Sequence, residues 1–278
     1  MTTLLDLDAA LPKQELIVGG GYGLFLKQTY IADNPELRTL FPLASLPRAR
    51  ATEDIDLILR ADVVTDSSAM KTIRKALDVL DFRVVETARY MQFVRPFSPG
   101  QVKIDLLAAP LGSLAKRVPK DPRRVKPRPS VKLHASKLEE AIAVDREPLR
   151  VPVSGVLSDG TAHSTTILIP QAFSYLLMKL FAFRDRCHDA QNDLGRHHAV
   201  DVYRIVGLLT PEEDAAVHRL SEEFSDNPLV REGCRIAMDH FVSPNGVGRL
   251  RIREHPLFHS AVDLERLAEE LTELLPID

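Results

Sequence analysis

The sequence ELIVGGGYG at residues 15–23, followed by TEDIDL at residues 52–57, decides the fold of this chain. The apolar run ELIV predicts a short buried strand, and the glycines that follow it predict a tight turn. From Gly23 to Ile31 the apolar residues recur at roughly helical spacing. The sequence therefore predicts a strand, a turn and a helix as its first structural unit.

Strand patterns dominate the rest of the first half, and helical patterns dominate the second. We expect strands over 55–59, 82–86, 91–97, 102–109, 151–156 and 164–170, and a helix over 67–80. Further helices are expected from Pro170, over 196–208, from Thr210 with a capping box, and over 264–274. These patterns predict an α/β (α+β) chain, with a small mixed-sheet domain over 1–165 and a mostly helical domain over 166–278.

The composition of the 278 residues excludes several classes of protein. No uninterrupted apolar run is long enough for a membrane span, and the N-terminus lacks the pattern of a secretion signal, so we expect a cytoplasmic protein with no membrane partner. Cys187 and Cys234 are the only cysteines, and we expect two reduced thiols.

Basic residues are concentrated in one segment, although the whole chain has a formal net charge of -3. This segment contains a single acid, Asp121, and nine basic residues: Lys116, Arg117, Lys120, Arg123, Arg124, Lys126, Arg128, Lys132 and Lys137. Five prolines between residues 110 and 129 predict an extended loop, a basic arm over about 110–137. A solvated loop is one interpretation; contact with nucleic-acid phosphates, through Arg117, Arg123, Arg124, Lys126 and Arg128, is the one we favour.

Three aspartates form the candidate chemical site. Asp54 and Asp56 are two residues apart in a predicted strand, so both carboxylates point to the same face. Asp105 lies in another apolar strand and can join them if the two strands are neighbours. Carboxylates about 4 Å apart repel by roughly 4 kcal/mol at an effective dielectric near 20, so such a cluster needs cations.

The chemistry of these oxygen ligands indicates Mg²⁺ or Mn²⁺, with two ions held by Asp54, Asp56 and Asp105. Upstream, the turn Gly19-Gly20-Gly21 allows backbone N–H groups and a helix N-terminus to approach a triphosphate. A dinucleotide fingerprint is disfavoured, because it needs a third glycine where Leu24 stands.

The order IVGG, helix, TEDIDL and IDLL resembles the polymerase-beta-like nucleotidyltransferase superfamily, and most closely its AbiEii-type toxin branch, which includes MenT-like toxins. Lys179 in YLLMKLFAFRDR and Asp201 in HHAVDVYRIV resemble a lysine and an aspartate of that branch. The resemblance implies catalytic roles for Asp54, Asp56, Asp105, Lys179 and Asp201, and nucleotide binding by Gly19, Gly20, Gly21, Thr52 and Lys179.

The resemblance also implies a function. It predicts transfer of a nucleoside monophosphate from an NTP to an acceptor. As the acceptor we favour RNA, and above all the 3′ end of tRNA. If the chain is the toxin of a toxin-antitoxin system, its protein partner is a cognate antitoxin.

Several alternatives stay open. The acceptor could be a small molecule such as an aminoglycoside, or a protein side chain. The chain could also be a non-catalytic nucleotide-binding module. Lys179 could extend its ammonium into water. Asp201 could pair structurally with Arg184 or Arg204. The histidines His188, His197 and His198 lack a set of four zinc ligands, so we expect ordinary surface or cleft histidines.

Overall fold

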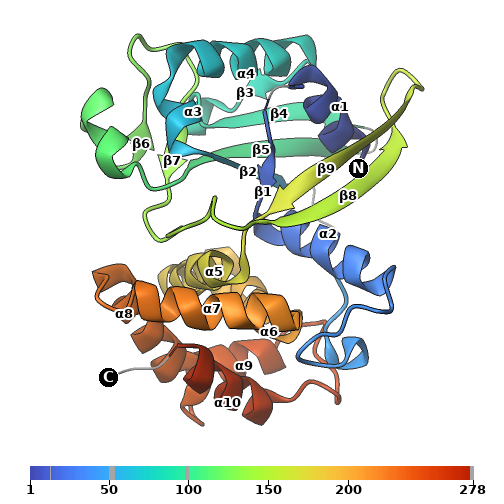
Figure 1. Cartoon of the computed structure of the whole chain (residues 1–278), viewed down its shortest axis with the longest axis vertical. Helices are drawn as coiled ribbons and strands as arrows, with labels where there is room; N and C mark the ends of the chain where they lie inside the picture. The colour runs from blue at the N-terminus through green and yellow to red at the C-terminus, as the bar shows by residue number, and fades with distance from the viewer. Residues whose placement is uncertain (13, 50–53, 98–99, 276–278) are drawn as a thin grey trace. The chain divides into compact units, whose positions relative to one another are not determined.

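The computed structural model describes all residues except 13, 50–53, 98–99 and 276–278, and it divides the chain into two compact units (Figure 1). The first unit comprises residues 1–27, 50–139 and 143–170. The second comprises residues 28–49, 140–142 and 171–278. Sheet and helices are therefore segregated along most of the sequence, and each unit is described by itself below.

The first unit is a mixed sheet with helices beside it. Its helices are α1 (Thr2–Ala10), the start of α2 (Gly20–Ala32), α3 (Ala61–Thr65) and α4 (Ser67–Val79), with short 3₁₀ turns η2 (Glu86–Ala88) and η3 (Gly112–Arg117). Its strands are β1 (Ile17–Val18), β2 (Asp54–Leu59), β3 (Arg83–Val84), β4 (Gln92–Phe97), β5 (Gly100–Ala108), β6 (Arg124–Val125), β7 (Ala135–Lys137), β8 (Leu149–Val156) and β9 (Ala162–Ile169).

The sheet order is β3-β4-β5-β2-β1-β9-β8, and β7 also pairs with β5 and with β6. Strand β2 lies in the middle, parallel to β5 on one side and antiparallel to β1 on the other. The hairpin expected over 151–156 and 164–170 is confirmed by the antiparallel pair β8 and β9. The mixed α/β class expected from the sequence is confirmed as well.

Alternating burial explains why β2 presents its acids on one face. Ile55 and Leu57 are buried, whereas Asp54 is exposed and Asp56 is half-buried. Helix α4 buries an apolar stripe that includes Ile73, and α1, α3 and α4 lie together on one side of the sheet (Figure 1). The carboxylates of β2 project from the face of the strand opposite to Ile55 and Leu57.

The prediction of a plain extended loop over 110–137 is wrong. Residues in this segment form η3, β6 and β7, and β7 extends the sheet by pairing in parallel with β5. The prolines lie outside β6 and β7, so they remove no N–H group that these strands need. Asp121 also orders the chain before β6, because its Oδ1 accepts hydrogen bonds from the backbone N–H groups of Arg123 and Arg124.

Other boundaries differ from the sequence-based ones. Helix α2 begins at Gly20 rather than near Gly23, because a left-handed glycine lets the chain turn into the helix directly after β1. The strand expected over 82–86 is limited to β3, since the chain turns into η2 immediately afterwards. Helix α1 packs against β8 and β9, in a stretch for which the sequence analysis proposed no element.

The second unit is helical. Its elements, besides the end of α2, are η1 (Leu43–Ser45), α5 (Ala172–Arg186), η4 (Ala190–Gly195), α6 (Arg196–Gly207), α7 (Pro211–Glu223), α8 (Pro228–Ala237), the π-helical turn η5 (Met238–Val242), α9 (Val247–Arg253) and α10 (Leu264–Leu274). The capping box at Thr210 and Glu213 is confirmed. Cys187 and Cys234 are buried free thiols, as expected, and burial raises the pKa of each. Among the described residues, no helix combines the length and apolarity needed to cross a membrane.

Candidate functional site

The glycine turn is built directly against the first aspartate strand. The N–H group of Gly19 donates a 2.9 Å hydrogen bond to the backbone oxygen of Asp56, and Gly20 has a left-handed φ of +63°. A Cβ atom at Gly20 would lie only 1.9 Å from Oδ2 of Asp56, so no side chain fits there while that carboxylate keeps its position. Gly21 follows in the first turn of α2. The turn therefore brings a helix N-terminus to the Asp56 carboxylate.

The third aspartate joins the pair through strand register. In the parallel pair of β2 and β5, Asp56 is the partner of Asp105, and Asp54 is the partner of Lys103. Partners in a parallel pair point to the same face, and neighbouring strands lie about 4.7–4.9 Å apart. The expectation that the two aspartate strands are neighbours is thus confirmed, and Asp54, Asp56 and Asp105 share one face of the sheet.

Lys103, which the sequence patterns did not single out, forms ion pairs with two of these carboxylates. Its Nζ atom lies 3.3 Å from Oδ2 of Asp54 and 3.2 Å from Oδ2 of Asp105. Burial opposes the charged form of Lys103, yet attraction by Asp105 and Asp54 outweighs it, so the pKa of Lys103 is raised. The alternation VKID could have revealed it, since Lys103 and Asp105 are two residues apart in one strand.

The carboxyl group of Asp105 is perturbed by its surroundings. Burial raises the pKa of its carboxyl group above the usual value, and the opposing attraction of Lys103 only reduces that increase. Gln92 on β4 is the cross-strand partner of Asp105, and its side chain lowers the pKa of that carboxyl group by less than burial raises it. Among the described residues, the buried Oδ1 atom of Asp105 has no hydrogen-bond partner. An oxygen in this state can still accept a proton or ligate a cation.

The fit to divalent metal can be judged from these contacts. Within the described parts of the chain, no group of three or more His, Cys, Asp or Glu side chains is arranged to hold an ion, and the Lys103 ammonium lies between two of the aspartates. The donor chemistry nevertheless suits Mg²⁺, since Asp54, Asp56 and Asp105 supply hard oxygens from neighbouring strands. The unpartnered Oδ1 of Asp105 also fits a cation.

Lys179 and Asp201 meet inside the second unit. Nζ of Lys179 lies 2.7 Å from Oδ2 of Asp201, and Nη1 of Arg204 lies 3.2 Å from its Oδ1. All three are buried, and Arg204 also donates to Oε1 of Gln28. Burial alone would raise the pKa of Asp201, but the charges of Lys179 and Arg204 lower it overall.

Two of the alternatives for this pair are therefore wrong. The ammonium of Lys179 does not extend into water, because the side chain is held in the interior by Asp201. Arg184 is not the partner of Asp201; it pairs with Asp185 and Glu232. The alternative pairing with Arg204 is confirmed.

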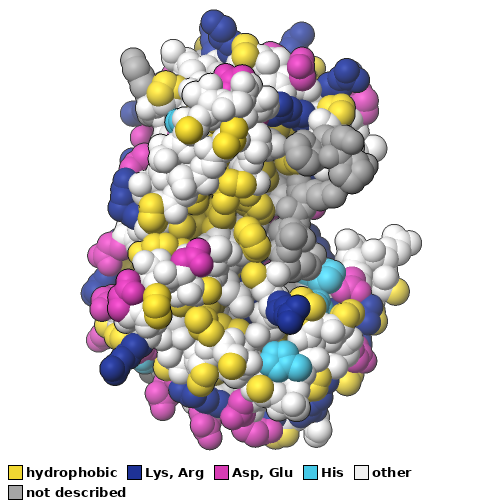
Figure 2. All heavy atoms as spheres, turned by 90° about the vertical axis from the view of Figure 1, so that its right-hand side faces the viewer, with side chains coloured by type: hydrophobic (Ala, Val, Ile, Leu, Met, Phe, Trp, Pro, Cys, Tyr) yellow, Lys and Arg dark blue, Asp and Glu magenta, His cyan; other side chains and the backbone are white. Residues whose placement is uncertain are grey.

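The basic segment, residues 116–137, exposes most of its charge. Six of its side chains are exposed: Lys116, Arg117, Lys120, Arg123, Arg128 and Lys132. Arg124 and Lys126 are half-buried, and Lys126 pairs with Asp121 at 2.9 Å. The hydrogen bond from Lys126, together with those from the backbone N–H groups of Arg123 and Arg124, lowers the pKa of Asp121 to about 2. On the face drawn in Figure 2, by contrast, basic and acidic side chains are interspersed.

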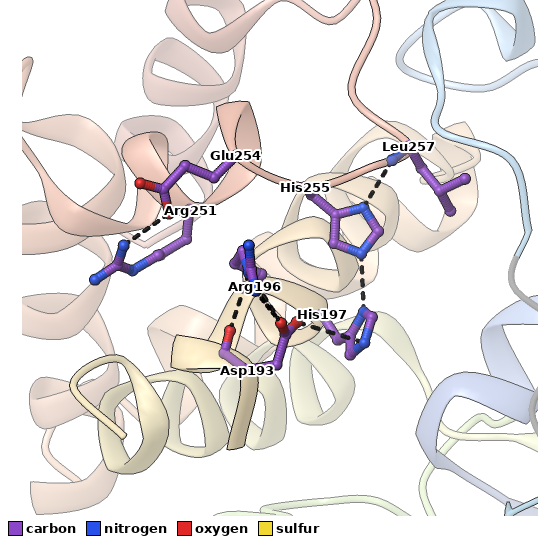
Figure 3. A network of polar contacts seen from close by, with 7 residues as sticks. All are labelled: Asp193, Arg196, His197, Arg251, Glu254, His255 and Leu257. Atoms are coloured by element: carbon purple, nitrogen blue, oxygen red, sulfur yellow. Dashed lines mark hydrogen bonds and ion pairs between the residues drawn. The ribbon is translucent and has the colours of Figure 1, made fainter. Parts of the chain in front are cut away.

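Thr52, the remaining nucleotide-binding candidate, lies outside the described residues. A histidine network in the second unit was not predicted from the sequence (Figure 3). The N–H group of Leu257 donates to Nδ1 of His255, so Nε2 of His255 carries its proton and donates to Nδ1 of His197 at 2.8 Å.

The network continues to a carboxylate. Nε2 of His197 faces Oδ2 of Asp193 at 3.4 Å, and Asp193 also pairs with Arg196. His197 is therefore held between two partners rather than free on the surface. No spacing rule in the sequence joins it to His255, because 58 residues separate them.

Comparisons with family models, with curated proteins and with solved structures found no match to this chain.

Proposed function

We propose that this chain is a magnesium-dependent nucleotidyltransferase of the cytosol, which transfers a nucleoside monophosphate from an NTP to RNA, with the tRNA 3′ end as the leading acceptor. The observation that carries the proposal is the register of Asp56 beside Asp105, with Gly20 packed against the Asp56 carboxylate. Acids on adjacent strands beside a glycine turn at a helix N-terminus combine metal ligands with a phosphate cradle.

In the proposed reaction, an acceptor hydroxyl attacks the α-phosphorus of the NTP, and pyrophosphate leaves as the new phosphoester forms. Asp54, Asp56 and Asp105 would hold Mg²⁺, which supplies charge stabilisation to the phosphoryl oxygens when it is bound. The N–H groups at the start of α2 bind and orient the triphosphate. Asp105, whose pKa is raised by burial, accepts the proton of the attacking hydroxyl.

The basic segment supports an RNA acceptor. Its exposed side chains Arg117, Arg123 and Arg128 belong to the same unit as the aspartates, and contact with phosphates needs such unburied cations. A small cationic acceptor such as an aminoglycoside would be repelled by this segment. We also propose that the chain acts as the toxin of a toxin-antitoxin pair and binds a cognate antitoxin protein.

Lys179 and Asp201 stabilise the second unit as a buried ion pair. One observation favours a different function: Lys103 already forms ion pairs with two of the carboxylates without metal, which suits a non-catalytic nucleotide-binding module.

Incubation with each α-labelled NTP and total tRNA tests the proposal. Label should move to RNA with release of pyrophosphate, and Asp54→Ala combined with Asp56→Ala should abolish the transfer. The control is Asp62→Asn, an exposed acid on α3 whose loss should leave transfer intact. Full transfer by the double variant would refute the assigned site, whereas NTP binding without pyrophosphate release would support the module. Circular dichroism checks that each variant is folded.

A further inference from the structure

Lys103 occupies a particular place within the aspartate cluster. It is the register partner of Asp54 and lies two residues before Asp105 on β5, so all three side chains share one face. Its ammonium contacts one oxygen of Asp54 and one oxygen of Asp105, at 3.3 and 3.2 Å. One cation therefore bridges carboxylates that belong to two different strands.

A divalent ion shared by Asp54 and Asp105 would need the same position. Mg²⁺ binds carboxylate oxygens at about 2.0–2.1 Å, and an ammonium that contacts the same oxygens would repel it at short range. We propose that Lys103 is a resident counter-cation, which holds these carboxylates together without metal and has to leave them when a divalent ion binds. The proposal rests on the proposed function, since it concerns the metal ligands of that site.

The side chain is suited to such an exchange. Lysine carries a compact charge on a flexible four-carbon stem, and 29% of the Lys103 side chain is exposed, so the ammonium has a path to solvent. The strand ladder fixes Asp105, and Gln92 contacts it from β4. Departure of Lys103 would thus free carboxylate oxygens without moving the strands.

Metal affinity tests this role of Lys103 without any need for catalysis. Titration of the full chain with Mn²⁺, followed by electron paramagnetic resonance without nucleotide, should show that Lys103→Gln binds Mn²⁺ at least roughly tenfold more tightly than wild type. Lys103→Arg should keep the weak affinity, because the positive charge remains. Lys137→Gln is the matched control: Lys137 is also 29% exposed and pairs with Glu139 at 3.6 Å, so its loss should change nothing.

A second measurement needs no variant. Amine acetylation followed by mass spectrometry should show that Mn²⁺ increases the labelling rate of Lys103 and leaves that of Lys137 unchanged. Mn²⁺ binding with equal affinity in wild type and Lys103→Gln, or without faster labelling of Lys103, would overturn this inference and leave the proposed function standing. Absence of Mn²⁺ binding in both proteins, even with a non-hydrolysable NTP, would overturn the inference and the metal-dependent function together.

Discussion

Asp56 on β2 and Asp105 on β5 are direct partners in a parallel strand pair, so their carboxylates lie side by side on one face of the sheet. A slip of one residue between these strands would turn Asp105 to the opposite face, where it could share no ligand with Asp56. Gly20, at the start of α2, lies so close to the Asp56 carboxylate that no side chain fits at position 20. The candidate site therefore depends on register and on one glycine as much as on the acids.

Replacement of this glycine should damage both the fold and the site. Gly20→Ala places a methyl group 1.9 Å from the Asp56 carboxylate and also imposes a left-handed conformation on alanine. We expect a loss of about 1–3 kcal/mol from overpacking, in addition to about 1 kcal/mol from the backbone, in the free energy of unfolding measured with urea. Mn²⁺ binding should fall with it, because Asp56 is displaced.

Gly112→Ala separates the two effects. Gly112 also has a positive φ, +51°, but nothing lies within 4 Å of its Cβ position. Only the backbone cost of about 1 kcal/mol is expected there. Equal losses for Gly20→Ala and Gly112→Ala would contradict the close approach of Gly20 to Asp56.

The buried cluster of the second unit should respond unequally to loss of its acid and of its lysine. Asp201→Asn leaves Lys179 and Arg204 buried without a carboxylate, which should cost about 3–5 kcal/mol. Lys179→Met should cost less, because Asp201 keeps Arg204. Chemical denaturation measures both, and Asp226→Asn, which breaks a largely exposed pair, should cost at most about 1 kcal/mol. The reverse order would show that Lys179 is the main partner of Asp201.

Salt should weaken RNA binding through the basic segment. Each phosphate contact contributes roughly 0.7 to the slope of log K against log salt for single strands, so Arg123→Ala combined with Arg128→Ala should reduce that slope by about one to two. The matched pair Arg231→Ala and Arg235→Ala removes two exposed arginines of the second unit and should leave the slope unchanged. Fluorescence anisotropy with labelled tRNA at several salt concentrations measures the slopes. Equal slopes for the two double variants would remove the segment from the binding surface.

Acidification should destabilise the protein partly through His198. Burial, reinforced by the charges of Lys179 and Arg186, lowers the pKa of this histidine to about 3 from its ordinary 6.5. Below pH 6.5 the imidazole of His198 is therefore protonated in the unfolded chain but stays neutral in the native state. The free energy of unfolding thus decreases as the pH falls from 6.5 toward 3. Urea unfolding at several pH values should show a shallower loss for His198→Leu than for wild type. The same pH dependence in both would contradict a neutral native His198.

Local sequence determined the elements and the composition of the site. The alternation in DIDLIL placed Asp54 and Asp56 on one face, the glycines marked the turn, and Thr210 with Glu213 marked a helix start. These features follow from the period of a strand and from capping, which depend on residues a few positions apart.

Tertiary structure alone decided which distant residues meet. Strand register brings Asp105 beside Asp56, and burial brings Lys179 to Asp201. Residues 28–49 likewise join the second unit, although most of that unit comes much later in the sequence. Lys103 became a bridge between carboxylates only through the pairing of β2 with β5. The physical reason is that long-range pairing and exclusion of water arise when the chain packs, and no local periodicity encodes either.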